Sequence, residues 1–222
     1  GTQYNYSGGG YTLLQLIIEE VTGETFSAYM QREVLDPLGM THSSFEWRAD
    51  LQQATAAAYS ETRVPLPNYL FTEQAAAGLY STAPDMARFL AAEMPGPHGE
   101  PAGRGVLAPD TLALMFTPVI HHQGLGQGVS KLLDGSKLIE HGGANQGWNS
   151  VISANPEHGW GLVILTNSDN GWPLIQKGLP EWVNFLNMQF ANRILIPLLT
   201  LGLLICAFFL VKDFTSQRRS MK

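Results

Sequence analysis

A histidine followed by two glycines, His141-Gly142-Gly143, is the part of this sequence best suited to chemistry. It comes directly after a short apolar stretch, and Ala144 follows it. Residues without side chains let a substrate lie against bare backbone, and a neighbouring imidazole can donate a hydrogen bond or transfer a proton. We interpret this run as the edge of an acyl-transfer site. Because His-Gly-Gly alone is more often a turn than a site, the interpretation needs support from elsewhere in the chain.

Other segments give that support, because they occur in a set order along the chain. They are residues 4–23, 35–40, 76–89 and 162–167. Together they resemble the serine beta-lactamase and penicillin-binding-protein superfamily, on its class C and esterase-like side, over roughly residues 4–170. That superfamily works with three elements: a nucleophilic Ser with a Lys one helical turn later, a Tyr-x-Asn or Ser-x-Asn element, and a Lys-Thr-Gly or His-x-Gly strand. The sequence contains counterparts of the second and third elements.

The resemblance implies that Tyr6 takes part in proton transfer. In the superfamily, the Tyr of the Tyr-x-Asn element lies against the nucleophile and moves protons, and Tyr6-Ser7-Gly8 matches this element at its first position. Gly8 stands where the superfamily has an Asn that helps to hold the substrate amide. This departure favours esterase or peptidase activity over beta-lactam hydrolysis.

The resemblance also implies that His141 occupies the Lys position of the Lys-Thr-Gly strand. Gly142 and Gly143 then allow close approach of the substrate, and the backbone N–H of Ala144 is one donor to the oxyanion. We therefore predict Tyr6 and His141 as the catalytic residues of this chain. Three residues that follow either line the same cleft or pack within its loop: Asn145, Gln146 and Trp148.

The expected nucleophile is absent from these 222 residues. No serine has a Lys three positions later, and losing the nucleophile removes the covalent route altogether. In the superfamily this motif lies upstream of the Tyr element, and the sequence begins at Gly1 rather than at Met. We therefore expect the C-terminal portion of a serine hydrolase, inactive alone, with the motif encoded upstream. The alternative is a pseudoenzyme, a non-catalytic module that binds cell-wall peptides.

Composition limits the partners. The net charge is −6 and Lys and Arg form no basic stripe, so we expect no nucleic acid partner. Cys206 is the only cysteine, which excludes an internal disulfide. His121 and His122 are adjacent without a third ligand at zinc spacing, so we expect neither a metal nor another cofactor. The expected substrates are those of the superfamily: a peptidoglycan peptide, a beta-lactam or a small ester.

Residues 194–211 form an uncharged stretch close to the roughly 20 residues that a helix needs to cross a membrane. A buried core helix is the alternative, but an apolar helix after a complete family fold has nothing to pack against. Basic residues are more frequent after the stretch than before it, which places residues 212–222 in the cytoplasm. We predict a single-pass protein of the cell membrane, with the hydrolase portion, residues 1–190, outside the cytoplasm. This topology requires an upstream export signal.

The spacing of apolar residues changes along the chain, from helical to alternating. Helices are predicted over residues 13–21, 26–34, 82–90 and 109–116, from apolar spacing and from capping residues. Strands are predicted over residues 129–133, 137–140, 149–154 and 161–166, separated by turn signals. This order indicates an α+β fold, with a helical part beside an antiparallel sheet, and an incomplete fold would leave an unpaired strand edge and exposed apolar surface. Residues 171–192 either cover the sheet as a helix or place Trp172 and Trp182 at a membrane interface.

Overall fold

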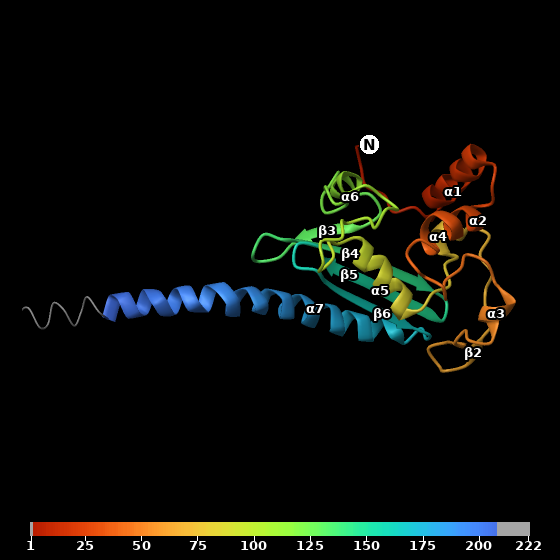
Figure 1. Ribbon diagram of the computed structural model, residues 1–222. Helices are drawn as coiled ribbons and strands as arrows, with labels where there is room; N and C mark the ends of the chain where they lie inside the picture. Colours follow the sequence, from red (N-terminus) through yellow and green to blue (C-terminus); the bar gives the residue numbers. More distant parts are fainter. Residues whose placement is uncertain (1, 208–222) are drawn as a thin grey trace, which may run out of the picture.

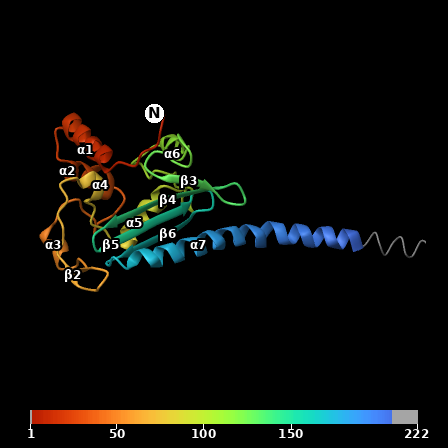
Figure 2. The ribbon, with the colours of Figure 1, turned by 180° about the vertical axis from the view of Figure 1, so that it is seen from behind.

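The computed structural model describes residues 2–207, and it confirms the α+β fold. Short helices occupy the first half of the chain, an antiparallel sheet follows, and a long helix closes the described part (Figure 1). The long helix extends well beyond the rest of the molecule, so the shape is a domain with a rod attached (Figures 1 and 2).

The first helix ends at the predicted glycine but begins five residues before the predicted start, because Ser7 caps it. Helix α1 spans Gly8–Thr22; the Ser7 hydroxyl accepts a hydrogen bond from the N–H of Gly10, and Gly23 ends the helix with φ of 70°. Helix α2 covers Phe26–Met30 and continues as the π-helical turn η1, Gln31–Leu35. The sequence did not suggest the short helices α3, Ala49–Gln52, and α4, Gln74–Ala77, which have no side-chain N-cap.

Helix α5, Ala83–Ala92, begins at the predicted cap, where the Thr82 hydroxyl accepts from the N–H of Asp85. The Asp85 side chain turns away from the cap and is fully buried. It accepts hydrogen bonds from the N–H of His42 and the hydroxyl of Ser43, both at 2.8 Å, and from the guanidinium of Arg88 at 2.7 Å. This carboxylate therefore fixes the loop after η1 to the start of α5.

The main sheet has four antiparallel strands in the order β3-β4-β5-β6. Their bounds are Gly128–Lys131, Lys137–Asn145, Trp148–Asn155 and Trp160–Thr166. Strand β4 is longer than the sequence predicts, because the backbone of residues 141–145 continues the pairing with β5. A second, two-stranded sheet joins β1, Ala58–Tyr59, to β2, Pro65–Leu66.

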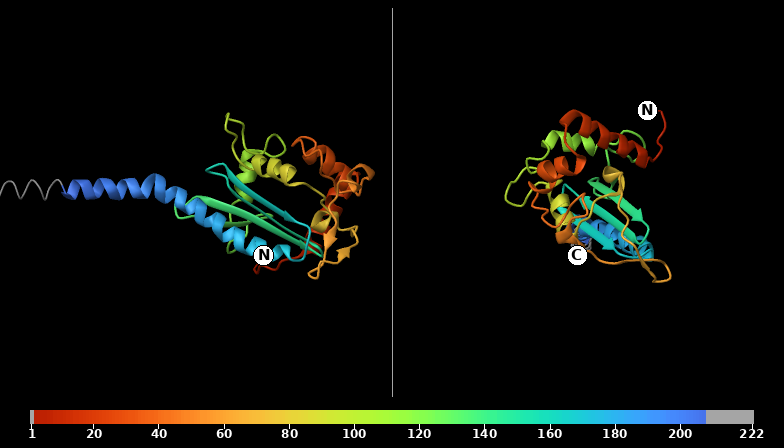
Figure 3. Two further views of the ribbon diagram at one scale, coloured as in Figure 1. Left: turned by 90° about the horizontal axis from the view of Figure 1, so that it is seen from below. Right: turned by 90° about the vertical axis from the view of Figure 1, so that its right-hand side faces the viewer.

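The two faces of the main sheet carry different hydrophobic clusters. On one face, Ile139 and Ala154 pack against Leu90 of α5 and Phe116 at the end of α6, Pro109–Met115. On the other face, Leu138 packs against α7, Gly171–Phe190. Figure 3 shows α5 and α6 on one side of the sheet and α7 on the other. Because side chains alternate along each strand, the sheet packs against helices on both faces.

The two tryptophans of helix α7 have different surroundings. Trp182 packs on the sheet, and its indole N–H donates to the Ser153 hydroxyl at 3.2 Å, whereas Trp172 is exposed. The helix continues through the π-helical turn η2, Ala191–Leu195, to Ala207. The resulting 37-residue helix is long and apolar enough to cross a membrane, and none of its apolar stretch is buried. Residues 208–211 of the predicted span and the tail 212–222 lie outside the described residues.

Apolar surface remains open within residues 2–207. Helix α1 buries no residue, and Leu13, Ile17 and Val21 on it are all exposed. Strand β6 pairs with β5 on one edge and with no described main-sheet strand on the other. Unpaired edges and apolar patches of this kind favour association with other chains.

Candidate active site

His141 lies in the middle of β4, opposite Ile152 of β5. Because side chains alternate along a strand, its imidazole is on the same face as Ile139, the face covered by α5 and α6. Burial lowers the pKa of His141 below its usual value, and a backbone hydrogen bond with Gly142 opposes this effect. The imidazole is therefore neutral at pH 7, the state in which it can accept a proton.

The strand edge beside His141 is open. Strand β3 pairs with β4 as far as Glu140, and residues 141–145 pair only with β5. The N–H of Leu132 donates to the carbonyl of Ser136 at the hairpin, so even-numbered residues of β4 direct their backbone groups toward β3. Gly142 and Ala144 continue this edge beyond the last β3 partner, and both are exposed. An extended ligand can therefore pair with their N–H and C=O groups.

Gly143 leaves room for a neighbouring hydroxyl. A Cβ atom at Gly143 would lie 2.6 Å from Oγ of Ser150, whereas one at Gly142 would meet its nearest atom at 3.6 Å. Ser150 is directly opposite Gly143 on β5, so its side chain shares the face of His141. The position of Ser150 beside Gly143 could not be predicted from the sequence, because only the strand register brings the two residues together.

Tyr6 precedes α1 and is 66% exposed. Two short distances place the start of this helix. A Cβ atom at Gly8 would lie 4.0 Å from Cβ of Ala76 in α4, and the Tyr11 hydroxyl lies 3.6 Å from the Cβ position of Gly126. Gly126 is in the loop that leads into β3. The start of α1, which follows Tyr6, therefore lies close to both α4 and the loop before β3.

The other end of the open edge reaches the same helix α4. The side-chain amide of Asn145 donates to the carbonyl of Ala77 at 3.2 Å. Helix α4 thus contacts both the end of β4 and the start of α1, which brings the Tyr6 and His141 segments to one side of the domain. Among the described residues no hydrogen bond joins the two side chains directly.

The residues after Ala144 have separate roles. Asn145 holds α4, as described above, so packing accounts for this side chain. Gln146 is exposed in the turn to β5, and Trp148 is half-buried opposite Asn145. The turn itself is fixed by Gly147, which has φ of 80° and donates its N–H to Asp169 at 2.6 Å.

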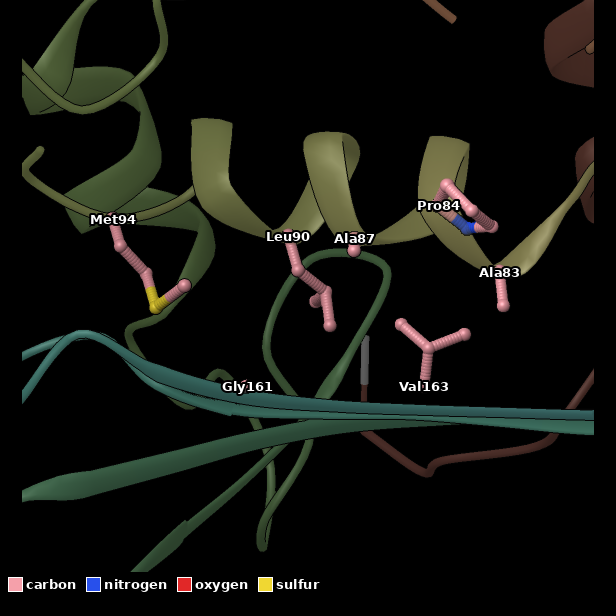
Figure 4. Close-up of a pocket in the computed structure, with 7 residues that line it drawn as sticks. All are labelled: Ala83, Pro84, Ala87, Leu90, Met94, Gly161 and Val163. Atoms are coloured by element: carbon pink, nitrogen blue, oxygen red, sulfur yellow. The ribbon is translucent and has the colours of Figure 1, made fainter. Parts of the chain in front are cut away.

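A hollow of about 440 Å³ between α5 and β6 does not belong to this site. Figure 4 shows side chains of α5 facing Val163 of β6 across it. Its lining has no polar side chain that could orient or activate a substrate; it consists of Ala83, Pro84, Ala87, Leu90, Met94, Gly161 and Val163. Within residues 2–207 no group of three His, Cys, Asp or Glu side chains could hold a metal ion.

Known proteins match this chain in sequence. The teichoic acid D-alanine hydrolase of Staphylococcus aureus is 30% identical over 92 residues, which cover 40% of this chain and 23% of the hydrolase. A human beta-lactamase-like protein is 28% identical over 122 residues, or 54% of this chain and 23% of that protein. The matched part of this chain thus spans about a quarter of the length of these relatives.

Solved structures match the fold. The octameric penicillin-binding protein homologue from Pyrococcus abyssi superposes with a TM-score of 0.61 at 25% identity, over 76% of this chain and 40% of that chain. A D-alanine carboxypeptidase from Burkholderia cenocepacia gives a TM-score of 0.66 at 20% identity, over 76% and 57%. The family model named Beta-lactamase matches residues 1–177. The chain therefore belongs to the beta-lactamase family.

Proposed function

We propose that this chain supplies the proton-transfer and substrate-binding half of a serine hydrolase that works through an acyl-enzyme. The observation that carries the proposal is the open edge of β4 beside His141, where Gly142 and Ala144 present backbone groups that pair with no other strand of residues 2–207. In this proposal Tyr6 and His141 are the catalytic residues, and the serine nucleophile comes from a segment outside these 222 residues.

The roles follow from the chemistry of acyl transfer. A substrate that pairs with the β4 edge places its carbonyl near the N–H of Ala144, which donates to the oxyanion as the tetrahedral intermediate forms. Gly142 and Gly143 allow this approach, because neither adds side-chain bulk above or below the strand that the ligand pairs with. A neutral His141 and the Tyr6 hydroxyl can then exchange the proton between the nucleophile and the leaving group.

The proposed substrates are D-alanyl esters or peptides of the cell wall. Two relatives carry names that refer to D-alanine, one a teichoic acid D-alanine hydrolase and the other a D-alanine carboxypeptidase. Gly8 replaces the amide side chain that would hold a substrate amide, which favours the ester. Beta-lactams are a further candidate, because their acyl-enzyme has the same geometry.

The domain organisation is part of the proposal. Residues 1–190 form the hydrolase portion, residues 194–211 cross the cell membrane, and residues 212–222 form a cytoplasmic tail. The long unburied apolar helix, described as far as Ala207, supports an anchor of this kind. In membranes from cells that express the full-length protein, the chain should resist extraction by alkaline carbonate.

Covalent labelling tests the reaction. The full-length protein, purified in detergent, should form an adduct with a fluorescent penicillin or a fluorophosphonate, detected by intact mass spectrometry. Tyr6→Phe and His141→Ala should slow adduct formation on the order of 10²-fold or more, as expected for proton-transfer groups. Tyr4→Phe is the matched control, because this nearby tyrosine is also exposed. Saturable binding of a cell-wall peptide without any adduct would instead identify a pseudoenzyme.

A further inference from the structure

Two turns of the main sheet lie beside the C-terminal part of α7. They join β3 to β4, residues 132–136, and β5 to β6, residues 156–159. The backbone N–H of Leu133 donates to the side-chain oxygen of Asn187 in α7 at 2.9 Å. Figures 1 and 2 show the first of these turns reaching along α7 toward the apolar extension. This end of the sheet is therefore the part of the domain nearest to the proposed span.

The side chains gathered there have the character of a membrane interface. Leu133 is 75% exposed at the tip of its turn. Arg193, the last charged residue before the apolar stretch, places its guanidinium 5.8 Å from the centre of the Trp160 ring, and Phe185 lies 6.1 Å from the same ring. Tryptophans and snorkelling arginines are typical of the boundary between water and lipid.

We propose that this end of the sheet rests in the phospholipid headgroup layer of the membrane that the long helix crosses. We name it the lipid-facing end and define it by Leu133, Trp160, Phe185 and Arg193. The inference rests on the proposed membrane span. It adds a second point of contact, which fixes the orientation of the domain to the bilayer.

The spacing along the helix agrees with this placement. Asn187 precedes Ile194 by seven residues, which is about 10 Å at 1.5 Å per residue. The headgroup layer on each side of the hydrocarbon is about 6 Å thick, and membrane helices tilt by about 20° on average. A tilt toward the turn brings the exposed Leu133 side chain to headgroup depth.

The charges at this end also suit phospholipid headgroups. Lys131, Lys137 and Arg193 are three cations near the two turns. Asp134 already accepts from the imidazole of His158 at 2.6 Å and from the hydroxyl of Ser136 at 2.5 Å. Glu157 of the second turn accepts from the backbone N–H of Lys137 at 3.2 Å. Both acidic groups are thus engaged within the turns, and the two lysines and the arginine outnumber them and can meet phosphate groups.

The placement has a consequence for the candidate site. His141 is four residues along β4 from Lys137, or about 13 Å at 3.3 Å per residue. The open edge of β4 then runs away from the lipid-facing end. The site is held at a fixed height above the bilayer, where it can reach substrates attached close to the membrane.

A depth measurement tests the inference. In the full-length protein, Cys206→Ser removes the cysteine of this chain, and Leu133→Cys or Thr62→Cys supplies a site for an environment-sensitive fluorophore. Thr62 is the matched control: it is exposed, and its turn is tied to the start of α7 by the hydrogen bond from Asn170 to Glu61. Each labelled protein is reconstituted into vesicles of phosphatidylcholine and phosphatidylglycerol that contain a headgroup-spin-labelled lipid.

We expect the fluorophore at position 133 to be quenched several-fold more strongly than the one at position 62. Equal quenching at the two positions, in protein that alkaline carbonate does not extract, would overturn the lipid-facing end while leaving the span intact. Release of the protein by carbonate would refute the span itself, and with it this inference. The covalent-labelling assay remains independent of both results.

Discussion

Replacing Glu93 by Gln should remove a pH-dependent loss of stability that is built into the core. Glu93 directly follows α5 and is 5% exposed, and Gln127, just before β3, is 7% exposed. The amide of Gln127 donates to Oε1 of Glu93. Oε2 of Glu93 and Oε1 of Gln127 have no hydrogen-bond partner among the described residues. A protonated Glu93 satisfies both atoms at once, by donating from Oε2 to the amide oxygen.

The size of the effect follows from the pKa of Glu93. Burial raises it from the usual 4.5 to about 7, while the hydrogen bond from Gln127 opposes the rise. Between these two values the folded state keeps a proton that the unfolded state has lost. Stability therefore falls as the pH rises from 4.5 to about 7, by about 3 kcal/mol in total, and this contribution is constant at higher pH.

Denaturant titration of the full-length protein in detergent, at pH 5 and pH 8, measures this difference. Glu93→Gln should match the unmodified protein within about 1 kcal/mol at pH 5 and exceed it by up to about 3 kcal/mol at pH 8. Glu20→Gln is the control, because Glu20 is exposed on α1. An equal loss of stability between the two pH values in Glu93→Gln and in the unmodified protein would show that Glu93 is not the titrating group.

Three further predictions concern the site and the loop that α5 holds. Gly143→Val should reduce the rate of covalent labelling more than Gly142→Ala does, because a Cβ atom at position 143 would lie 2.6 Å from the Ser150 hydroxyl. Adding Ser150→Ala to Gly143→Val should restore part of the rate. Labelling should decline as the pH falls, with a midpoint below 6.5, because burial lowers the pKa of His141; a decline centred above 6.5 would contradict this. Asp85→Ala should lower the free energy of unfolding by about 3 kcal/mol, through the loss of hydrogen bonds to a buried carboxylate, whereas the exposed Asp110→Ala should change it by less than about 1 kcal/mol.

Much of the fold could be predicted because its signals are local. Gly23 ends α1 and Thr82 begins α5, since a cap depends on residues within four positions. Asp134-Gly135-Ser136 turns the chain between β3 and β4, and Gly135 has the φ of 85° that favours glycine there. The short helices α3 and α4 lack such signals; α4 packs against α1 and α2.

The candidate site also combines residues that the sequence predicts with pairings that it does not. The sequence identifies His141 and its glycines by residue type, and it identifies Tyr6 through the resemblance; their catalytic roles stay predictions. The strand register decides that β3 stops at Glu140, that the β4 edge is open beyond it, and that Ser150 lies beside Gly143. None of these pairings is marked in the residues themselves.

The family, the order of helices and strands, and the apolar stretch near the C-terminus could all be predicted from the residues alone. Three features depend on how the chain packs: the face that Trp182 covers, the pairing of Glu93 with Gln127 in the core, and the position of Leu133 beside α7. The reason is physical: caps and turns are satisfied by neighbours along the chain, whereas these contacts join residues tens of positions apart, and only the packing of the sheet between its helices brings them together.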